Sequence, residues 1–189
     1  MGKRYLAAII VAILLIVALA SAPSYANDTL NKRAVDSFIE TYGCMLEGIV
    51  WEAGAPESPG YFTSVIMTES TGKPDKVSKH GAIGLMQVKP IALKQVRQAF
   101  PDVHFSDDLF DPRNNMKVGV YYHAWLKYEY KLGMVFGDAA EVSVGYNLGP
   151  SGGAKYLRSN DAYDFGYVES IESWTKYQPV LICNMTASN

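Results

Sequence analysis

The stretch VIMTESTGKPDKVSKHGAIGLMQVKP, residues 65–90, places a single glutamate, Glu69, late in an apolar run and follows it with a glycine-bearing loop. Its neighbours Ile66 and Met67 are apolar, so its carboxyl is expected to lie partly out of water. Burial raises the pKa of a carboxyl and keeps its proton on at neutral pH, as a general acid requires. On this fragment alone, a solvated glutamate at a helix end is the simpler interpretation.

Helix signals surround this stretch on both sides. Ser58, followed directly by proline, is typical of a helix start, and it predicts a helix over about residues 59–70. Gly72 and Pro74 prevent that helix from continuing. A second proline begins a short helix over about residues 90–100. Glu69 is therefore expected at the C-terminal end of its helix, next to the loop.

Apolar residues at helical spacing and capping residues predict the other elements. The expected helices cover about residues 29–51, about 112–131, the segment from Asp138 to YNLGPSGG, and about 165–177. Asp138, with Glu141 three residues later, has the spacing of a capping box. The only strand signal is AIGLMQV, residues 82–88, which predicts at most a small hairpin. The expected fold class is all-α, in a single domain.

The N-terminus has the order of a secretory signal. A positive pair at residues 3–4 precedes an uncharged apolar run at 5–20, and the small-residue pattern Ser-Tyr-Ala follows at 24–26. We therefore expect a signal peptide over residues 1–26 and one domain over 27–189, periplasmic or exported. An uncleaved signal that anchors the protein stays open, and it would be the only contact with a membrane.

Cys44 and Cys183 are the two cysteines of the chain. In an oxidising compartment an even pair is typical of one disulfide, here between the first helix after the signal and the C-terminal tail. The alternative is two buried free thiols, because spacing alone does not show that the side chains meet.

Composition and motifs narrow the class of function. The chain has 189 residues, a net charge of −2 and a pI near 5.9, so it lacks the basic bias of nucleic-acid-binding proteins. His80, His104 and His123 lack the spacing of a zinc motif, and no nucleotide-binding fingerprint occurs. The aspartates within residues 107–111 precede a helix and are interpreted as caps. We expect neither a nucleic-acid partner nor a cofactor.

Four sequence blocks occur in a defined order between about residues 58 and 174. They are ES (69–70) with Pro74 and Ser78, then GAIGLMQ (81–87), GYNLGP (145–150) and GYVESI (166–171). Together they resemble the blocks of the peptidoglycan lytic transglycosylases of the soluble type. The resemblance implies a mainly helical, lysozyme-like catalytic domain similar to goose-type lysozyme.

The resemblance also implies a role for individual residues. Glu69 matches the family's sole catalytic acid/base, Ser78 a contact to the sugar's acetamido group, and Tyr167 a tyrosine close to the acid. The other matches are to residues that line the cleft, Met86 and Gln87, and to a pair that supports the glutamate and the substrate, Tyr146 and Asn147.

Some positions depart from the family pattern and put the details of the subsites in doubt. Gly72 replaces a residue that is often bulky, Gly145 replaces the common alanine, and Ile83 is larger than in some relatives. The stretch between Asn147 and Tyr167 is short, so we expect the far wall of the cleft to be trimmed.

By resemblance, the expected activity is cleavage of the bond between N-acetylmuramic acid and N-acetylglucosamine with formation of a 1,6-anhydromuramic end. The expected partner is the glycan strand, and by analogy a secretion, conjugation or pilus apparatus. Two alternatives stay open. One is a lysozyme-like hydrolase that uses a second carboxylate to hold water, and the other is a peptidoglycan-binding scaffold without turnover.

Overall fold

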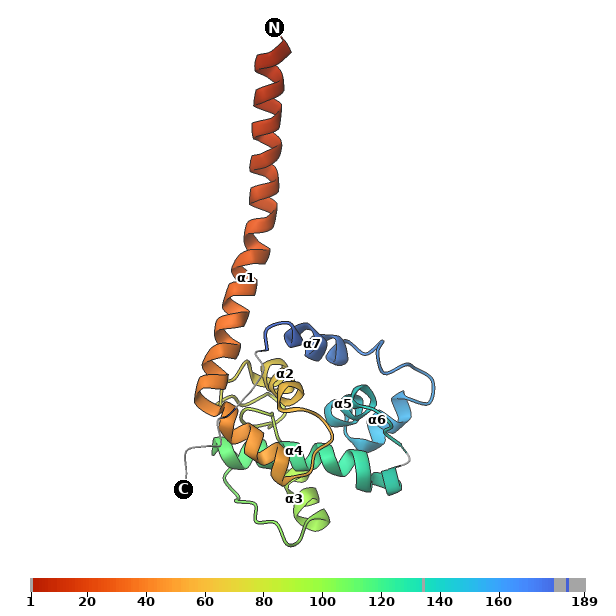
Figure 1. The fold of residues 1–189 in the computed structure, drawn as a ribbon. Helices are drawn as coiled ribbons and strands as arrows, with labels where there is room; N and C mark the ends of the chain where they lie inside the picture. The colour runs from red at the N-terminus through yellow and green to blue at the C-terminus, as the bar shows by residue number, and fades with distance from the viewer. Residues whose placement is uncertain (1, 134, 179–182, 184–189) are drawn as a thin grey trace. The chain divides into compact units, whose positions relative to one another are not determined.

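The structure is a computed structural model that describes residues 2–133, 135–178 and 183, without the side chains of residues 2–26 and 132. The chain divides into two compact units, Met1–Ala34 and Val35–Asn189. Figure 1 shows the helices α1 to α7 along the chain. Among the residues whose side chains are described, no helix is long and apolar enough to cross a membrane.

Helix α1 covers Gly2–Glu52, so it begins earlier than the expected start near residue 29 and ends where predicted. Its early part is rich in alanine and leucine, which favour helix. Within the second unit, α1 buries Val35, Leu46 and Ile49 completely or almost so. The predicted signal peptide falls on residues whose side chains lie outside the described part, and its cleavage stays a prediction.

Helix α2, Pro59–Ser70, carries many buried residues of the second unit. Ser58 caps it by accepting a hydrogen bond from the Tyr61 N–H, and Thr71 ends it in the left-handed conformation with φ 55°. Every residue from Phe62 to Met67 is buried. Helix α7, Gly166–Thr175, lies beside α2 (Figure 1) and buries Val168 and Ile171. The acid-bearing end of α2 therefore has α7 as a neighbour.

Two further helices of the second unit pack against each other. Helix α3, Pro90–Ala99, packs against α4, Pro112–Ala124, whose N-cap Asp111 accepts from the Asn114 N–H at 2.7 Å. The chain after α4 stays helical but changes type, first to the π-helix η1, Trp125–Glu129, and then to the 3-10 helix η2, Tyr130–Gly133. The sequence predicted this helical length and did not predict the change of type.

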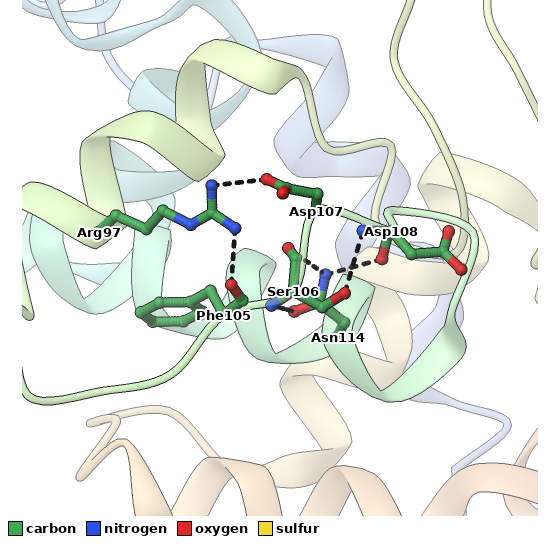
Figure 2. Close-up of polar contacts among 6 residues, drawn as sticks. All are labelled: Arg97, Phe105, Ser106, Asp107, Asp108 and Asn114. Atoms are coloured by element: carbon green, nitrogen blue, oxygen red, sulfur yellow. Dashed lines mark hydrogen bonds and ion pairs between the residues drawn. The ribbon is translucent and has the colours of Figure 1, made fainter.

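The connection between α3 and α4 is fixed by a polar network (Figure 2). The buried Asn114 side chain donates to the carbonyl oxygens of Ser106 and Asp108 at 3.0 and 2.7 Å and accepts from the Ser106 N–H at 2.9 Å. Arg97 pairs with Asp107 at 2.7 Å and donates to the Phe105 carbonyl at 2.6 Å. Of the three aspartates interpreted as caps, Asp111 caps α4, whereas Asp107 pairs with Arg97 and Asp108 accepts from the Phe110 N–H at 2.8 Å within the loop.

Helices α5, Ala139–Leu148, and α6, Pro150–Tyr156, complete the unit. Asp138 caps α5 as predicted, accepting from the Glu141 N–H at 2.9 Å. Helix α6 was not predicted. It packs closely on α5, since a Cβ on Gly153 would lie 2.6 Å from the Gly145 Cα, and a Cβ on Gly145 would lie 2.6 Å from the Phe136 ring. The far side of the cleft therefore carries a helix in the stretch that was expected to be trimmed.

The described residues contain isolated bridges and no β-sheet. Ile83 pairs antiparallel with Val77 and with Val88, so the predicted hairpin is reduced to these two bridges. The all-α fold class is confirmed. The structure also joins Cys44 and Cys183 in a disulfide with a Cα–Cα distance of 5.5 Å, which ties α1 to the C-terminal tail.

Candidate active site

The carboxyl of Glu69 lies at the last turn of α2 and is half-buried. The Tyr167 hydroxyl, which comes from α7, donates a hydrogen bond to Glu69 Oε1 at 2.6 Å. On the backbone side, Lys76 donates from Nζ to the Glu69 carbonyl oxygen. Two residues 98 positions apart are thus brought together by the packing of α7 against α2.

Burial raises the pKa of Glu69 above the ordinary carboxyl value of 4.5. Three groups oppose this effect by stabilising the charged form: the Tyr167 hydrogen bond first, then the positive charges of Lys76 and Lys89. Burial outweighs them, so the carboxyl keeps its proton to higher pH than a solvated glutamate does. This is the property that a proton donor to a leaving group needs.

Two tyrosines enclose the acid. Burial, followed by the nearby Glu69 charge, raises the pKa of both Tyr146 and Tyr167 well above the usual value. They therefore stay neutral and act as hydroxyl donors. Tyr146 donates at 2.8 Å to the carbonyl oxygen of Met86, which fixes its ring between α5 and the loop after α2.

A cleft of about 500 Å³ opens in front of Glu69. It brings together five of the predicted site residues: Glu69, Ser78, Gln87, Tyr146 and Asn147. Among the described residues that line it, Glu69 is the single carboxylic acid. A mechanism that needs two carboxyl groups therefore finds no second one among these described lining residues.

The loop that follows α2 is held in shape by its own polar groups. Ser78 Oγ accepts from the Ala82 N–H at 3.0 Å and from the His80 N–H at 3.3 Å, which leaves its proton free to donate into the cleft. Gln87 has a positive φ of 48°. Its Nε2 donates to the carbonyls of Lys76 and Gly84 at 3.1 and 3.0 Å, so its amide is oriented before any ligand arrives.

Asn115 on α4 holds this loop in place through side-chain hydrogen bonds, and it was not among the residues predicted from the sequence. Its side chain is completely buried; Oδ1 accepts from the Met86 N–H, and Nδ2 donates to the carbonyls of Ile83 and Leu109, each at 2.8 Å. Gly84 makes room for it, because a Cβ there would lie 2.3 Å from Asn115 Nδ2. Only the folded chain shows that this amide is aimed at the loop.

Met86 occupies a different place from the one that the resemblance implied. Its side chain is fully buried and packs against Gly119 of α4, where an added Cβ would lie 2.4 Å from the Met86 sulfur. It therefore does not line the cleft. Its backbone carbonyl contributes instead, as the acceptor for Tyr146.

Aromatic rings form another wall of the cleft. Tyr122 and Trp125 stack with ring centroids 5.5 Å apart, at the point where α4 passes into η1, and both line the cleft. Ile91 of α3, which is 68% exposed, also lines it. Flat apolar surfaces of this kind suit the hydrophobic faces of sugar rings. Tyr122 and Trp125 thus supply two cleft residues from a segment that is rich in aromatic side chains.

A buried polar chain lies beneath the site. His123 is 3.2 Å from the Glu57 carboxylate through Nδ1 and 3.1 Å from the Tyr61 hydroxyl through Nε2, and Tyr61 is 2.6 Å from Ser143 Oγ. It links α2, α4 and α5. His123 is thus a core residue, and the part of the chain that the structure describes has no cluster of three or more potential ligands for a metal ion.

A family model described as Transglycosylase SLT domain matches residues 50–167. The chain belongs to this family. The match includes Glu69, the loop after α2 and the cleft wall formed by α5, and it ends at Tyr167. It confirms the resemblance that the four sequence blocks carry. No curated protein matches the chain.

Solved structures share the fold. An inactive mutant of lytic transglycosylase Slt from Pseudomonas aeruginosa aligns with a TM-score of 0.61 at 21% identity, over 74% of this chain and 24% of that chain. The 70 kDa soluble lytic transglycosylase from Escherichia coli aligns with a TM-score of 0.60 at 22% identity, over 72% and 24%. A complex of the 70-kDa soluble lytic transglycosylase with bulgecin A aligns with a TM-score of 0.62 at 21% identity, over 82% of this chain and 29% of that chain. The chain thus spans about a quarter of the length of these proteins.

Proposed function

We propose that the protein is a peptidoglycan lytic transglycosylase that cleaves the β-1,4 bond between N-acetylmuramic acid and N-acetylglucosamine. The observation that carries the proposal is the half-buried Glu69, whose pKa is raised and whose carboxyl is the single acid among the described residues of the cleft. Membership of the transglycosylase family supports the same reaction.

The first step uses the protonated carboxyl. Glu69 gives its proton to the oxygen between the two sugars, and the bond from that oxygen to C1 of the muramic residue breaks. The acetamido oxygen of the same residue bonds to C1 and takes up the positive charge, so the protein needs no second carboxylate. Tyr167 then stabilises the Glu69 carboxylate through its hydrogen bond of 2.6 Å.

The second step uses the carboxylate. Glu69 removes the proton of the C6 hydroxyl, O6 bonds to C1, and the bond from C1 to the acetamido oxygen breaks. Glu69 is protonated again, no water is consumed, and the muramic end is a 1,6-anhydro sugar. Ser78, Gln87 and Asn147 are assigned to orient the glycan against the single acid.

The proposal also places the protein outside the cytoplasm, because its substrate is the cell wall and because the N-terminal pattern resembles a secretory signal. A role in opening the wall for a secretion, conjugation or pilus apparatus remains part of the proposal as a family-level analogy.

The test is digestion of purified peptidoglycan by the protein and by the Glu69→Gln variant, with mass analysis of the released fragments. We expect fragments one water lighter than their hydrated counterparts, and none from the variant. Hydrated reducing ends would show a hydrolase, and binding of strands without turnover by the unmodified protein would show a scaffold. Either result would contradict the proposal.

A further inference from the structure

We propose that Lys76 and Lys89, in the loop between α2 and α3, residues 71–89, bind carboxylate groups carried at C3 of the muramic acid next to the cleaved bond. The inference rests on the proposed function and adds to it: the substrate is recognised through its acidic C3 substituent as well as through its sugar rings.

The loop concentrates positive charge in a chain that is net acidic. Residues 71–89 hold four lysines against one aspartate, whereas the whole chain has a net charge of −2. All four lysines, Lys73, Lys76, Lys79 and Lys89, are exposed, and none forms an ion pair with a carboxylate of the described residues. Their charges are therefore available to a ligand.

Two of these cations, Lys76 and Lys89, lie close to the acid. Lys89 lines the same cleft as Glu69, Lys76 donates to the Glu69 backbone carbonyl, and both lower the pKa of the Glu69 carboxyl through their charge. Ser78 and His80, on either side of Lys79, also line the cleft. Positive charge from Lys76 and Lys89 thus lies beside the acid at which the muramic ring has to be bound.

The loop is fixed in this position. The Ser78 N–H donates to the Ala82 carbonyl at 2.9 Å, and Ile83 and Val88 exchange two backbone hydrogen bonds of 2.9 and 3.0 Å. Asn115 holds the same loop from α4. Because the loop backbone is already ordered, binding has to order only the lysine side chains and not the loop as well.

Substrate chemistry identifies the anion. The ring whose C1 reacts at Glu69 bears, on C3, a lactyl group that ends in a carboxylate or continues into a peptide with further carboxylates. A phosphodiester on C6 does not fit, because the proposed reaction needs a free C6 hydroxyl. The C3 substituent therefore brings its carboxylates close to the lysines whenever Glu69 reaches the bond.

The proposal also explains why lysine charges lie next to Glu69, although Glu69 must hold a proton for the first step. Free lysine charges favour the carboxylate form of Glu69, which is the wrong form for the first step. A bound substrate carboxylate offsets those charges, so the acid keeps its proton more firmly when the correct substrate is present.

The test compares three preparations of the same glycan strands. The first carries its peptides unmodified, the second has the carboxyls converted to neutral methylamides, and the third has lost its peptides but keeps the lactyl carboxylate. We expect kcat/KM about tenfold higher on the first than on the second, from two or more exposed ion pairs. In the first preparation the lactyl carboxyl is bonded to the peptide, so its advantage over the second reports the peptide carboxylates. The third tells whether a lactyl carboxylate can take their place: rates like the first show that the lysines accept either carboxylate, and rates like the second assign the peptide alone.

The variant Lys89→Gln should lower the ratio of the first two rates about three- to fivefold, whereas Lys89→Arg should keep it. Lys155→Gln, which removes an exposed lysine of α6 away from the cleft lining, is the matched control and should leave the ratio unchanged. At 1 M salt, where charges are screened beyond about 3 Å, the preference should shrink towards one.

Equal rates on unmodified and amidated strands would overturn the inference, as would an equal loss on both strands in Lys89→Gln. Calorimetric binding of the two strands to the Glu69→Gln variant keeps the test independent of turnover. Cleavage without charge preference removes only the lysine assignment. Charge-dependent binding without cleavage by the unmodified protein removes only the proposed reaction.

Discussion

Replacing Asn115 with alanine should destabilise the protein and disturb the site at the same time. The substitution removes three buried hydrogen bonds of 2.8 Å that join α4 to the loop after α2 and to Leu109. The Ile83 carbonyl keeps a partner, because the Val88 N–H donates to it at 2.9 Å. The Met86 N–H and the Leu109 carbonyl lose theirs.

The expected loss of stability comes from the Met86 N–H and the Leu109 carbonyl, which are left without partners. A buried donor or acceptor left without a partner costs about 1–3 kcal/mol, so the free energy of unfolding should fall by about 4 kcal/mol. The total stability of a natural domain is about 5–15 kcal/mol, which makes this a large fraction of it. Activity should fall beyond the loss of folded protein, because the Met86 carbonyl accepts the Tyr146 hydroxyl.

Urea unfolding followed by circular dichroism measures the effect, with activity assayed at urea concentrations far below the transition. Asn160→Ala is the matched control, since the Asn160 amide makes local, exposed hydrogen bonds to Tyr156 and Ser159. Its unfolding free energy should change by less than about 0.5 kcal/mol. A loss of under about 1 kcal/mol in Asn115→Ala would refute the view that this amide holds the loop.

Three further predictions concern charge and covalent structure. Since burial raises the folded-state pKa of Glu69 above 4.5, the native carboxyl destabilises the fold as pH rises through that pKa. Glu69→Gln should therefore have a higher melting temperature than the unmodified protein at pH 7 to 8 and lose this advantage below about pH 4, and a lower melting temperature at pH 8 would contradict this. The Tyr167 hydrogen bond stabilises the ionised Glu69, so Tyr167→Phe should move the alkaline limb of the pH–activity profile to higher pH, and a move to lower pH would be against the account. The disulfide Cys44–Cys183 closes a separation of 139 residues, so reduction should lower stability by up to about 5 kcal/mol in the chain-entropy model; two titratable thiols before reduction would exclude the bridge.

The helix starts were predictable because local chemistry sets them. Ser58 and Asp138 cap their helices through side-chain oxygens within three residues, and proline at the first turn follows Ser58 and Asp111. Such signals depend on neighbours in the chain and survive any change in distant packing. The end of α2 at Ser70 is set in the same way.

Helix α6 could not be predicted for the opposite reason. Pro150, Gly152 and Gly153 have the composition of a loop, and glycine disfavours helix in isolation. The folded chain needs them there because α6 approaches α5 so closely that a side chain at Gly153 would collide with the backbone of Gly145. A contact between two helices decided the structure against the local preference.

The same distinction between local signals and long-range contacts holds for the candidate site. The family resemblance identified Glu69, and the structure places Tyr167 against it across 98 residues. Which loop side chains line the cleft could not be predicted as well. A positive φ at Gly84 and at Gln87 turns the chain between them, and Met86 is buried against α4. Asn115 carries no motif chemistry, and only its three long-range hydrogen bonds reveal its role.

Digestion of peptidoglycan in water enriched in oxygen-18 tests the central claim most directly. If Glu69 alone serves as acid and base and the C6 hydroxyl closes onto C1, no solvent oxygen enters the product. Mass spectrometry should then find anhydromuramic ends without the heavy isotope, and no fragments from Glu69→Gln. Reducing ends that carry oxygen-18 would contradict the account, because they would show that a water molecule attacks C1.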